Sequence, residues 1–90
     1  MTVEVRVTSV LQRVVGGNRT VNANGGTVEE LIEDLEATYP GLKAQVTDDG
    51  TLRRFVNIYV NDEDIRYLDA MSTPLKDGDV VSILPALAGG

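Results

Sequence analysis

Carboxylates are the most frequent chemically capable side chains in this sequence. Asp62, Glu63 and Asp64 are consecutive, and Asp77 and Asp79 flank a glycine. Such groups can act as general acid and base, or bind calcium, when a cleft or a loop of suitable ligand spacing positions them. Both groups fall in turn-forming stretches without EF-hand spacing, and the chain has no His or Cys to act as a base, a thiolate or a zinc ligand. We therefore interpret them as solvated turn residues and expect no enzyme active site, no metal and no bound cofactor.

Glycine pairs are the other unusual feature. Gly16–Gly17 and Gly25–Gly26 lack the Lys and Ser/Thr of a phosphate-binding P-loop. Another pair ends the sequence, in a tail that comprises Ala86, Leu87, Ala88, Gly89 and Gly90. Because glycine has no side chain, such a tail can enter a narrow channel and present the Gly90 carboxylate to another protein's active site. In a chain without Cys, that carboxylate is the obvious carrier of a covalent group; the alternative is an ordinary disordered terminus.

Composition limits the size of the domain and the kind of partner. The chain has 90 residues and is 42% apolar, so we expect one globular domain at 1–85 and a flexible tail at 86–90. The formal net charge of −6 argues against nucleic acid and anionic membranes, because both require a basic surface. The expected partner is a protein with a basic or mixed surface. The N-terminus has charged residues instead of a signal peptide's apolar run, so we expect a cytoplasmic protein that is monomeric on its own.

Periodicity predicts the elements in the first half of the chain. Residues 2–7 alternate between apolar and polar side chains, and so do residues 19–23, which together predict a hairpin with a long loop. Thr27 and Glu30 have the spacing of a capping box. Apolar residues then recur at helical spacing, which predicts a helix from Thr27 to Tyr39.

The second half is richer in strand signals. We expect a short irregular turn at residues 42–46 and the strongest strand at residues 55–60, where branched and aromatic side chains follow one another. Residues 65–68 are predicted to pair back as a short strand, and residues 80–84 to form the last one. Pro85 has no amide donor, so it should mark the end of sheet pairing.

One main helix and about five short strands predict a two-layer α+β domain with the helix across one face of a mixed sheet. A hairpin, a crossover helix and a final strand that projects the tail are similar to the ubiquitin-like β-grasp fold. The apolar stripe of the helix should pack against alternate residues of the strands. This predicted core comprises Val28, Leu31, Ile32, Leu35, Val3, Val5, Val56, Ile58, Val81 and Ile83.

A two-layer domain leaves the other face of its sheet open. Residues that alternate with the predicted core point away from the helix, and an exposed apolar patch there often marks a protein-binding site. The candidate docking residues are Phe55, Tyr59 and Leu84, with the basic Arg54 beside them. The alternative is that loops cover the apolar residues, and that Arg54 acts with Arg53 and Arg66 as ordinary surface charge.

Two stretches carry a resemblance to a known family. The stretch "FVNIYVNDEDIR", followed by a Gly-Asp turn, and the end "LPALAGG" resemble the ubiquitin-like sulfur-carrier proteins. This family includes the small subunit of molybdopterin synthase and the thiamine-pathway sulfur carrier. The resemblance covers the whole chain and is greatest to the actinobacterial sulfur carrier of cysteine biosynthesis.

The resemblance implies a mechanism in which partners supply the catalysis. An E1-like enzyme would use ATP to adenylate the Gly90 carboxylate, and sulfur would displace AMP to leave a thiocarboxylate. In the cysteine branch, a pyridoxal-phosphate-dependent synthase would accept the sulfur as a carrier–cysteine adduct, and a metallopeptidase would release cysteine. In other branches a molybdopterin, thiazole or thiosugar synthase would accept it. The chain itself would be a co-substrate and not an enzyme.

Two other classes stay open at this point. A ubiquitin-like modifier would join Gly90 to lysines of target proteins, and the same activation chemistry would serve it. A plain β-grasp interaction module would have an incidental Gly-Gly tail. Intact mass separates the three, because a carrier exchanges oxygen for sulfur, a modifier forms larger conjugates, and a plain module does neither.

Overall fold

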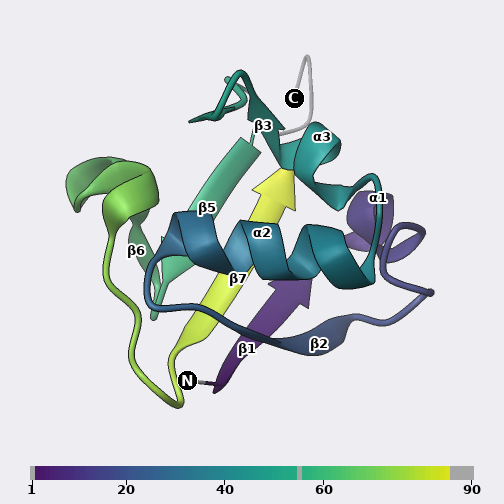
Figure 1. Ribbon diagram of the computed structural model, residues 1–90, viewed down its shortest axis with the longest axis horizontal. Helices are drawn as coiled ribbons and strands as arrows, with labels where there is room; N and C mark the ends of the chain where they lie inside the picture. Colours follow the sequence, from purple (N-terminus) through teal and green to yellow (C-terminus); the bar gives the residue numbers. More distant parts are fainter. Residues whose placement is uncertain (1, 55, 86–90) are drawn as a thin grey trace.

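A mixed five-stranded sheet forms one layer of the protein, and one long helix crosses it (Figure 1). The computed structural model describes residues 2–54 and 56–85. The chain's first and last strands, β1 and β7, are parallel neighbours at the centre of the sheet, and the other pairings are antiparallel. The spatial order is β2-β1-β7-β5-β6, and the strands are β1 (Thr2–Val7), β2 (Thr20–Asn24), β5 (Val56–Val60), β6 (Glu63–Asp64) and β7 (Val80–Pro85).

The predicted hairpin is confirmed as β1 and β2, with Val5 opposite Val21. Both side chains are buried, because alternation places them on the face that α2 covers. The long loop between the strands contains α1 (Ser9–Gln12), a short helix that the sequence analysis did not predict. Buried Leu11 and Val15 attach this loop to the core, so it is a packed part of the domain.

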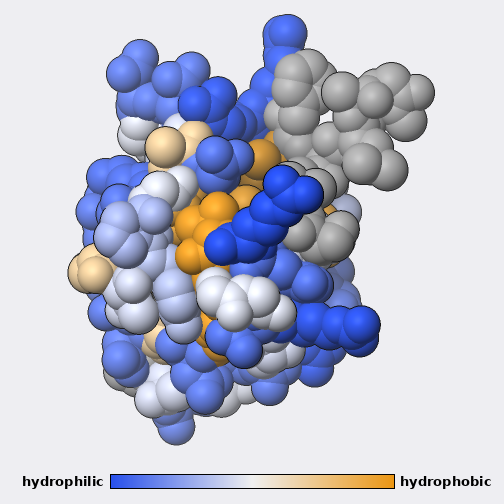
Figure 2. Space-filling view, turned by 90° about the vertical axis from the view of Figure 1, so that its right-hand side faces the viewer, coloured by the Kyte–Doolittle hydropathy of each residue, from blue (hydrophilic) through white to orange (hydrophobic). Residues whose placement is uncertain are grey.

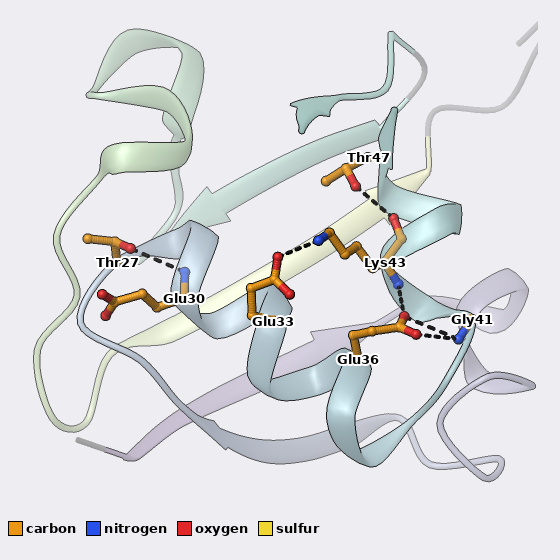
Figure 3. A network of polar contacts seen from close by, with 7 residues as sticks. All are labelled: Thr27, Glu30, Glu33, Glu36, Gly41, Lys43 and Thr47. Carbon is orange, nitrogen blue, oxygen red and sulfur yellow. Dashed lines mark hydrogen bonds and ion pairs between the residues drawn. The ribbon is translucent and has the colours of Figure 1, made fainter. Parts of the chain in front are cut away.

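The predicted helix is present as α2 (Val28–Thr38). Of the two hydrogen bonds that a capping box predicts, one is present. Thr27 Oγ1 accepts a hydrogen bond from Glu30 N at 3.2 Å (Figure 3). The Glu30 carboxylate accepts from Gly26 N at 2.8 Å, and not from Thr27 N as a capping box requires. The second bond is thus made one residue earlier than in a capping box, next to a β-bridge between Thr27 and Pro74.

The core lies between α2 and the inner face of the sheet. All the predicted core residues are buried. Further buried residues lie outside the predicted core: Leu11, Val15, Leu42, Val46, Ile65 and Leu75. On the side of the molecule where α1 lies, hydrophilic residues cover most of the surface, and apolar residues show mainly in a central area (Figure 2). Apolar burial is the main stabilising contribution in a domain of this size.

Residues 42–46 form a short helix, α3 (Leu42–Val46), and not the irregular turn that was predicted. Gly41 begins it at φ 102°, a left-handed conformation that favours glycine. The Glu36 carboxylate of α2 accepts hydrogen bonds from Gly41 N at 3.2 Å and from Lys43 N at 2.8 Å (Figure 3). Lys43 Nζ also pairs with Glu33. The Glu36 carboxylate on α2 therefore supplies the cap that the local sequence of α3 lacks.

The predicted strand at 65–68 is wrong. The strand that follows β5 and pairs back with it is β6, which begins two residues earlier than predicted. Ile65–Tyr67 form a 3-10 helix, η1, and a second one, η2 (Ala70–Ser72), follows. Asp64 causes the difference, because its carboxylate accepts a hydrogen bond from Arg66 N at 2.8 Å and caps η1. Ile65 is then buried in the core.

Asp49 and Gly50 form a turn between two very short strands. β3 (Thr47–Asp48) and β4 (Thr51–Leu52) pair across it and form a separate two-stranded sheet. Arg53 N donates to Val46 O at 2.8 Å and joins this turn to α3. In the ranges 2–54 and 56–85, no helix has the length and apolar character needed to cross a membrane.

Candidate functional site: the C-terminal strand and the outer sheet face

The strand that leads to the predicted tail lies at the centre of the sheet. Val81 and Ile83 of β7 are fully buried. The ladder with β1 runs to the pair Val7–Ile83, whereas the ladder with β5 continues to the pair Val56–Pro85. The last part of β7 is thus paired with β5 and not with β1.

Several predicted site residues lie outside the described part of the chain. They are Phe55, Ala86, Leu87, Ala88, Gly89 and Gly90. Pro85, which was predicted to mark the end of sheet pairing, lies in β7 opposite Val56. Residues 86–90 are not described, so the prediction stays open. The roles of the tail and of Phe55 therefore stay predictions.

The structure brings Tyr59 and Leu84 together on the outer face, which is the face turned away from α2. Tyr59 lies opposite Ser82, and Leu84 lies opposite Asn57, so the two apolar side chains are diagonal neighbours on adjacent strands. Both are half-buried, which leaves part of each side chain open to a partner. Arg54, the last described residue before β5, is exposed.

Arg66 is a member of this outer face that the docking prediction left out. Its Nη1 donates to Asn57 Oδ1 at 2.6 Å, its Nη2 donates to Val56 O at 2.7 Å, and Asp64 Oδ2 lies 3.7 Å from Nη1. β6 is only two residues long and pairs with Tyr59 and Val60, at the C-terminal end of β5. The Arg66 guanidinium therefore donates to the Val56 carbonyl at the other end of β5, on the side where β6 does not reach. No local pattern indicates this contact, because it depends on the turn between the two strands.

Three of the carboxylates considered above for acid–base chemistry accept hydrogen bonds from backbone amides: Asp64, Asp77 and Asp79. Asp79 accepts from Asn61 Nδ2 at 3.0 Å and from Lys76 N at 2.8 Å, and these hydrogen bonds, in that order, lower the pKa of its carboxyl group. Asn61 Oδ1 in turn accepts from Val80 N at 3.0 Å. Asp77 accepts from Thr2 N at 2.9 Å. The contacts of Asp77 and Asp79 support their interpretation as turn residues, and they fix the start of β7. For Glu63 and Asp64 the interpretation is wrong, because these two residues form the short strand β6.

No set of three or more His, Cys, Asp or Glu side chains positioned for a metal ion occurs among residues 2–54 and 56–85. The chain as a whole contains no His and no Cys. What the described residues offer is a central strand that ends at Pro85, beside a partly apolar sheet face.

Comparison with protein families identifies the group to which this arrangement belongs. The model of the ThiS family matches residues 5–90. The chain belongs to the ThiS family. The match includes the central strands, the outer face and the Gly-Gly end.

Individual relatives agree with the family assignment. The chain is 47% identical over 93 residues to sulfur carrier protein CysO of Mycobacterium tuberculosis, with both chains fully covered. It is 36% identical over 92 residues to small archaeal modifier protein 3 of Haloferax volcanii, again with both fully covered. In the crystal structure of the Amycolatopsis orientalis BexX/CysO complex, one chain matches with a TM-score of 0.93 and 44% identity, over 98% of this chain and 99% of that one.

The predicted fold class is confirmed. The mixed five-stranded sheet with one main helix matches the β-grasp structures of CysO proteins and of small archaeal modifier proteins. The resemblance to the ubiquitin-like sulfur-carrier family, and within it to the CysO type, is confirmed as well.

Proposed function

We propose that this protein is a sulfur carrier whose Gly90 carboxylate is the site of sulfur attachment. The observation that carries the proposal is full-length similarity to sulfur carrier protein CysO, combined with a central strand that ends at Pro85, five residues before the sequence ends in Gly-Gly. A carrier needs a rigid body for recognition and a terminus free of bulk for chemistry, and the chain provides both.

The chemistry runs through an adenylate. A Gly90 carboxylate oxygen attacks the α-phosphorus of ATP in an E1-like partner, and pyrophosphate leaves. A sulfur nucleophile at the oxidation level of sulfide then attacks the carbonyl carbon, AMP leaves, and a thiocarboxylate remains. Activation is required because a carboxylate is a poor electrophile, whereas the mixed anhydride with AMP has a good leaving group. The chain acts here as a protein co-substrate and provides no catalytic group.

Docking takes place on the outer face. Tyr59 and Leu84 offer a partly apolar surface next to the strand that leads to the tail, and Arg66 and Arg54 add positive charge to an otherwise acidic protein. In the Amycolatopsis orientalis crystal structure, CysO is in a complex with BexX. Because a similar protein forms such a complex, we propose that this chain also binds a partner protein, through its outer face.

Cysteine biosynthesis is the branch that we propose for the sulfur. The resemblance of strand β5 and of the tail to the actinobacterial carrier of that pathway supports it, as does the 47% identity to CysO. A pyridoxal-phosphate-dependent synthase would take the thiocarboxylate, and a metallopeptidase would release the product. Molybdopterin, thiazole and thiosugar synthases are the alternative acceptors.

The test is thiocarboxylate formation by a protein that lacks Gly90. Deletion shortens the reach of the tail by about 3.3–3.6 Å, and a misplacement of about 1 Å can lower a rate about a hundredfold. We expect the deletion to abolish sulfur gain in a reaction with ATP, the activating enzyme and a sulfur source, measured by intact mass. Gly89→Val should impair it through bulk. Ala88→Gly preserves the length and should react at the wild-type rate. Sulfur gain at the wild-type rate without Gly90 would refute the proposal.

A modifier function is the other candidate, because the H. volcanii relative is named a small archaeal modifier protein. In that case the activated Gly90 carbonyl would react with a lysine Nζ, AMP would leave, and an isopeptide bond would form. Expression of a tagged protein in its own host separates the functions. Conjugates that resist thiol reductants and disappear on deletion of Gly90 would favour the modifier, and a mass change limited to sulfur would favour the carrier.

A further inference from the structure

A groove lies at the start of β7, away from the strand's C-terminal end. It has a volume of about 570 Å³, which is in the range of ligand-sized pockets. One wall comes from η1 and the residues after it, and the other from the β5–β6 turn and the turn before β7. The residues central to its chemistry are Glu63, Tyr67, Leu68, Asp69, Lys76 and Asp79.

Two adjacent apolar side chains line this groove and are exposed. Tyr67 is 86% exposed to solvent, and Leu68 is 38% exposed. Within residues 2–54 and 56–85 these two are the exposed large hydrophobic residues. A single exposed apolar residue needs no explanation, but two consecutive ones on the wall of a groove indicate a contact surface.

The groove is built from segments that are held in place. Asn61, Asp79 and Val80 are joined by the hydrogen bonds described above, which fix one wall. On the other wall, Thr73 Oγ1 accepts from Asp69 N at 3.1 Å and donates to Ala70 O at 2.7 Å. Ala70 adopts φ 51°, a left-handed conformation that costs free energy in a residue with a Cβ. The fold therefore presents Tyr67 and Leu68 outward in spite of local strain.

The charge of the groove selects the kind of partner. Glu63 and Asp69 are exposed, and Asp79 is half-buried, against a single basic residue, Lys76. An occupant must therefore bring positive charge as well as apolar surface. We propose that this groove is a second docking surface, which binds a protein segment that carries arginine or lysine next to an aliphatic side chain. The aliphatic group contacts Tyr67 and Leu68, and the cation pairs with Glu63 or Asp69.

This surface lies at the opposite end of β7 from Pro85. β7 runs from Val80, beside the groove, to Pro85, and five steps of about 3.3 Å separate its ends by about 16 Å. A partner in the groove leaves the last residues of β7 free for another protein. The groove proposal does not depend on the chemistry proposed for Gly90.

The test uses the full-length protein, labelled with ¹⁵N, and short acetylated, amidated peptides as probes. One peptide alternates Arg and Leu, a second alternates Glu and Leu, and a third alternates Arg and Ser. We expect the Arg/Leu peptide to shift amide signals around the groove, at Asn61, Leu68 and Lys76. The other two should bind at least about tenfold more weakly, a difference of ~1.4 kcal/mol.

Matched variants separate apolar contact from charge. Tyr67→Ser with Leu68→Ser should weaken Arg/Leu binding about tenfold, whereas Tyr67→Phe preserves the ring and should keep it. Glu63→Gln with Asp69→Asn should weaken binding and its salt dependence. Glu29→Gln with Asp48→Asn removes the same charge from exposed positions outside the groove, and should have little effect.

Several results would overturn the proposal. Shifts spread along the acidic face of α2, or equal binding of the Arg/Leu and Arg/Ser peptides, would show attraction by net charge alone. Arg/Leu binding that survives Tyr67→Ser with Leu68→Ser would place the contact elsewhere. A dimer in sedimentation experiments that becomes monomeric with Tyr67→Ser would show that the groove binds a second copy of this chain and not a basic segment.

Discussion

The two faces of β7 differ although they belong to the same six residues. On the inner face, Val81 and Ile83 are fully buried under α2, in contact with the core. On the outer face, Val80, Ser82 and Leu84 are half-buried, and no helix covers them in the part of the chain that the structure describes. Alternation along one strand therefore separates residues that stabilise the fold from residues that a partner can reach.

This difference has a physical consequence for mutation. Substitution on the inner face removes packed apolar atoms and leaves a cavity, so the free energy of unfolding should fall strongly. Substitution on the outer face changes a partly solvated surface, so stability should change little while recognition changes. Four experiments follow, from the largest expected effect on stability to the smallest, and the first and the last test this separation directly.

The largest effect is expected inside the core. Ile83→Ala and Leu35→Ala should each lower the free energy of unfolding by about 2–5 kcal/mol, because both side chains are almost completely buried. Denaturant unfolding followed by circular dichroism measures this. Leu84→Ala, one position along β7 and on the other face, is the matched control and should cost much less. A similar loss for Ile83→Ala and Leu84→Ala would contradict the separation of the two faces.

Gly25→Ala should cost about 1–3 kcal/mol through overpacking. A Cβ at this position would lie 2.6 Å from Leu31 N and 2.8 Å from Leu31 Cα, and backbone atoms of α2 cannot move independently of the helix. Gly26→Ala is the control, since its Cβ would meet only the flexible carboxylate of Glu30, at 3.0 Å. Thermal unfolding compares the two. An equal effect for both variants would show that α2 shifts freely on the sheet.

The Asp79–Asn61 contact at the start of β7 should contribute a smaller, pH-dependent amount. Hydrogen bonds from Asn61 and from Lys76 N lower the pKa of Asp79, so its carboxylate stabilises the folded state above the ordinary carboxyl pKa. This contribution is lost as the pH falls through the lowered pKa of the folded protein. Asp79→Asn should therefore be less stable than the wild type at neutral pH, and the gap should close in acid. Denaturant unfolding across a pH series measures the gap, and a constant difference at all pH values would contradict the role of the charge.

The smallest effect on stability, with the largest effect on recognition, is expected for Leu84→Glu. Its free energy of unfolding should change by less than about 1 kcal/mol, because the side chain is half-exposed. Activation by the E1-like partner should weaken, as an apolar contact is replaced by a charge. Thr20→Glu puts the same charge on the outer face of β2, two strands from β7, and is the control. Equal activation of Leu84→Glu and wild type would exclude this face as the docking surface.

Sequence reasoning succeeded where a signal is local. The alternating valines of β1, the apolar stripe of α2 and the strand β5 each follow from the spacing of a few neighbouring residues. It failed at 65–68, where strand-like residues follow Asp64, because the Asp64 cap and the burial of Ile65 favoured a 3-10 helix. It also failed at 42–46, since the cap of α3 comes from Glu36 on another helix.

The candidate site shows the same division. The sequence by itself determined the acidic charge, the absence of His and Cys, the alternation that puts Tyr59 and Leu84 on one face, and the Gly-Gly end. Only the tertiary structure decided that β7 lies between β1 and β5, that Arg66 serves the Val56 carbonyl, and that Tyr67 and Leu68 line a groove with Asp79. Periodicity reports which side of an element is apolar, and it is written in neighbouring residues. Pairing, caps from other elements and grooves depend on contacts between residues far apart in the chain, which form only when the whole core packs.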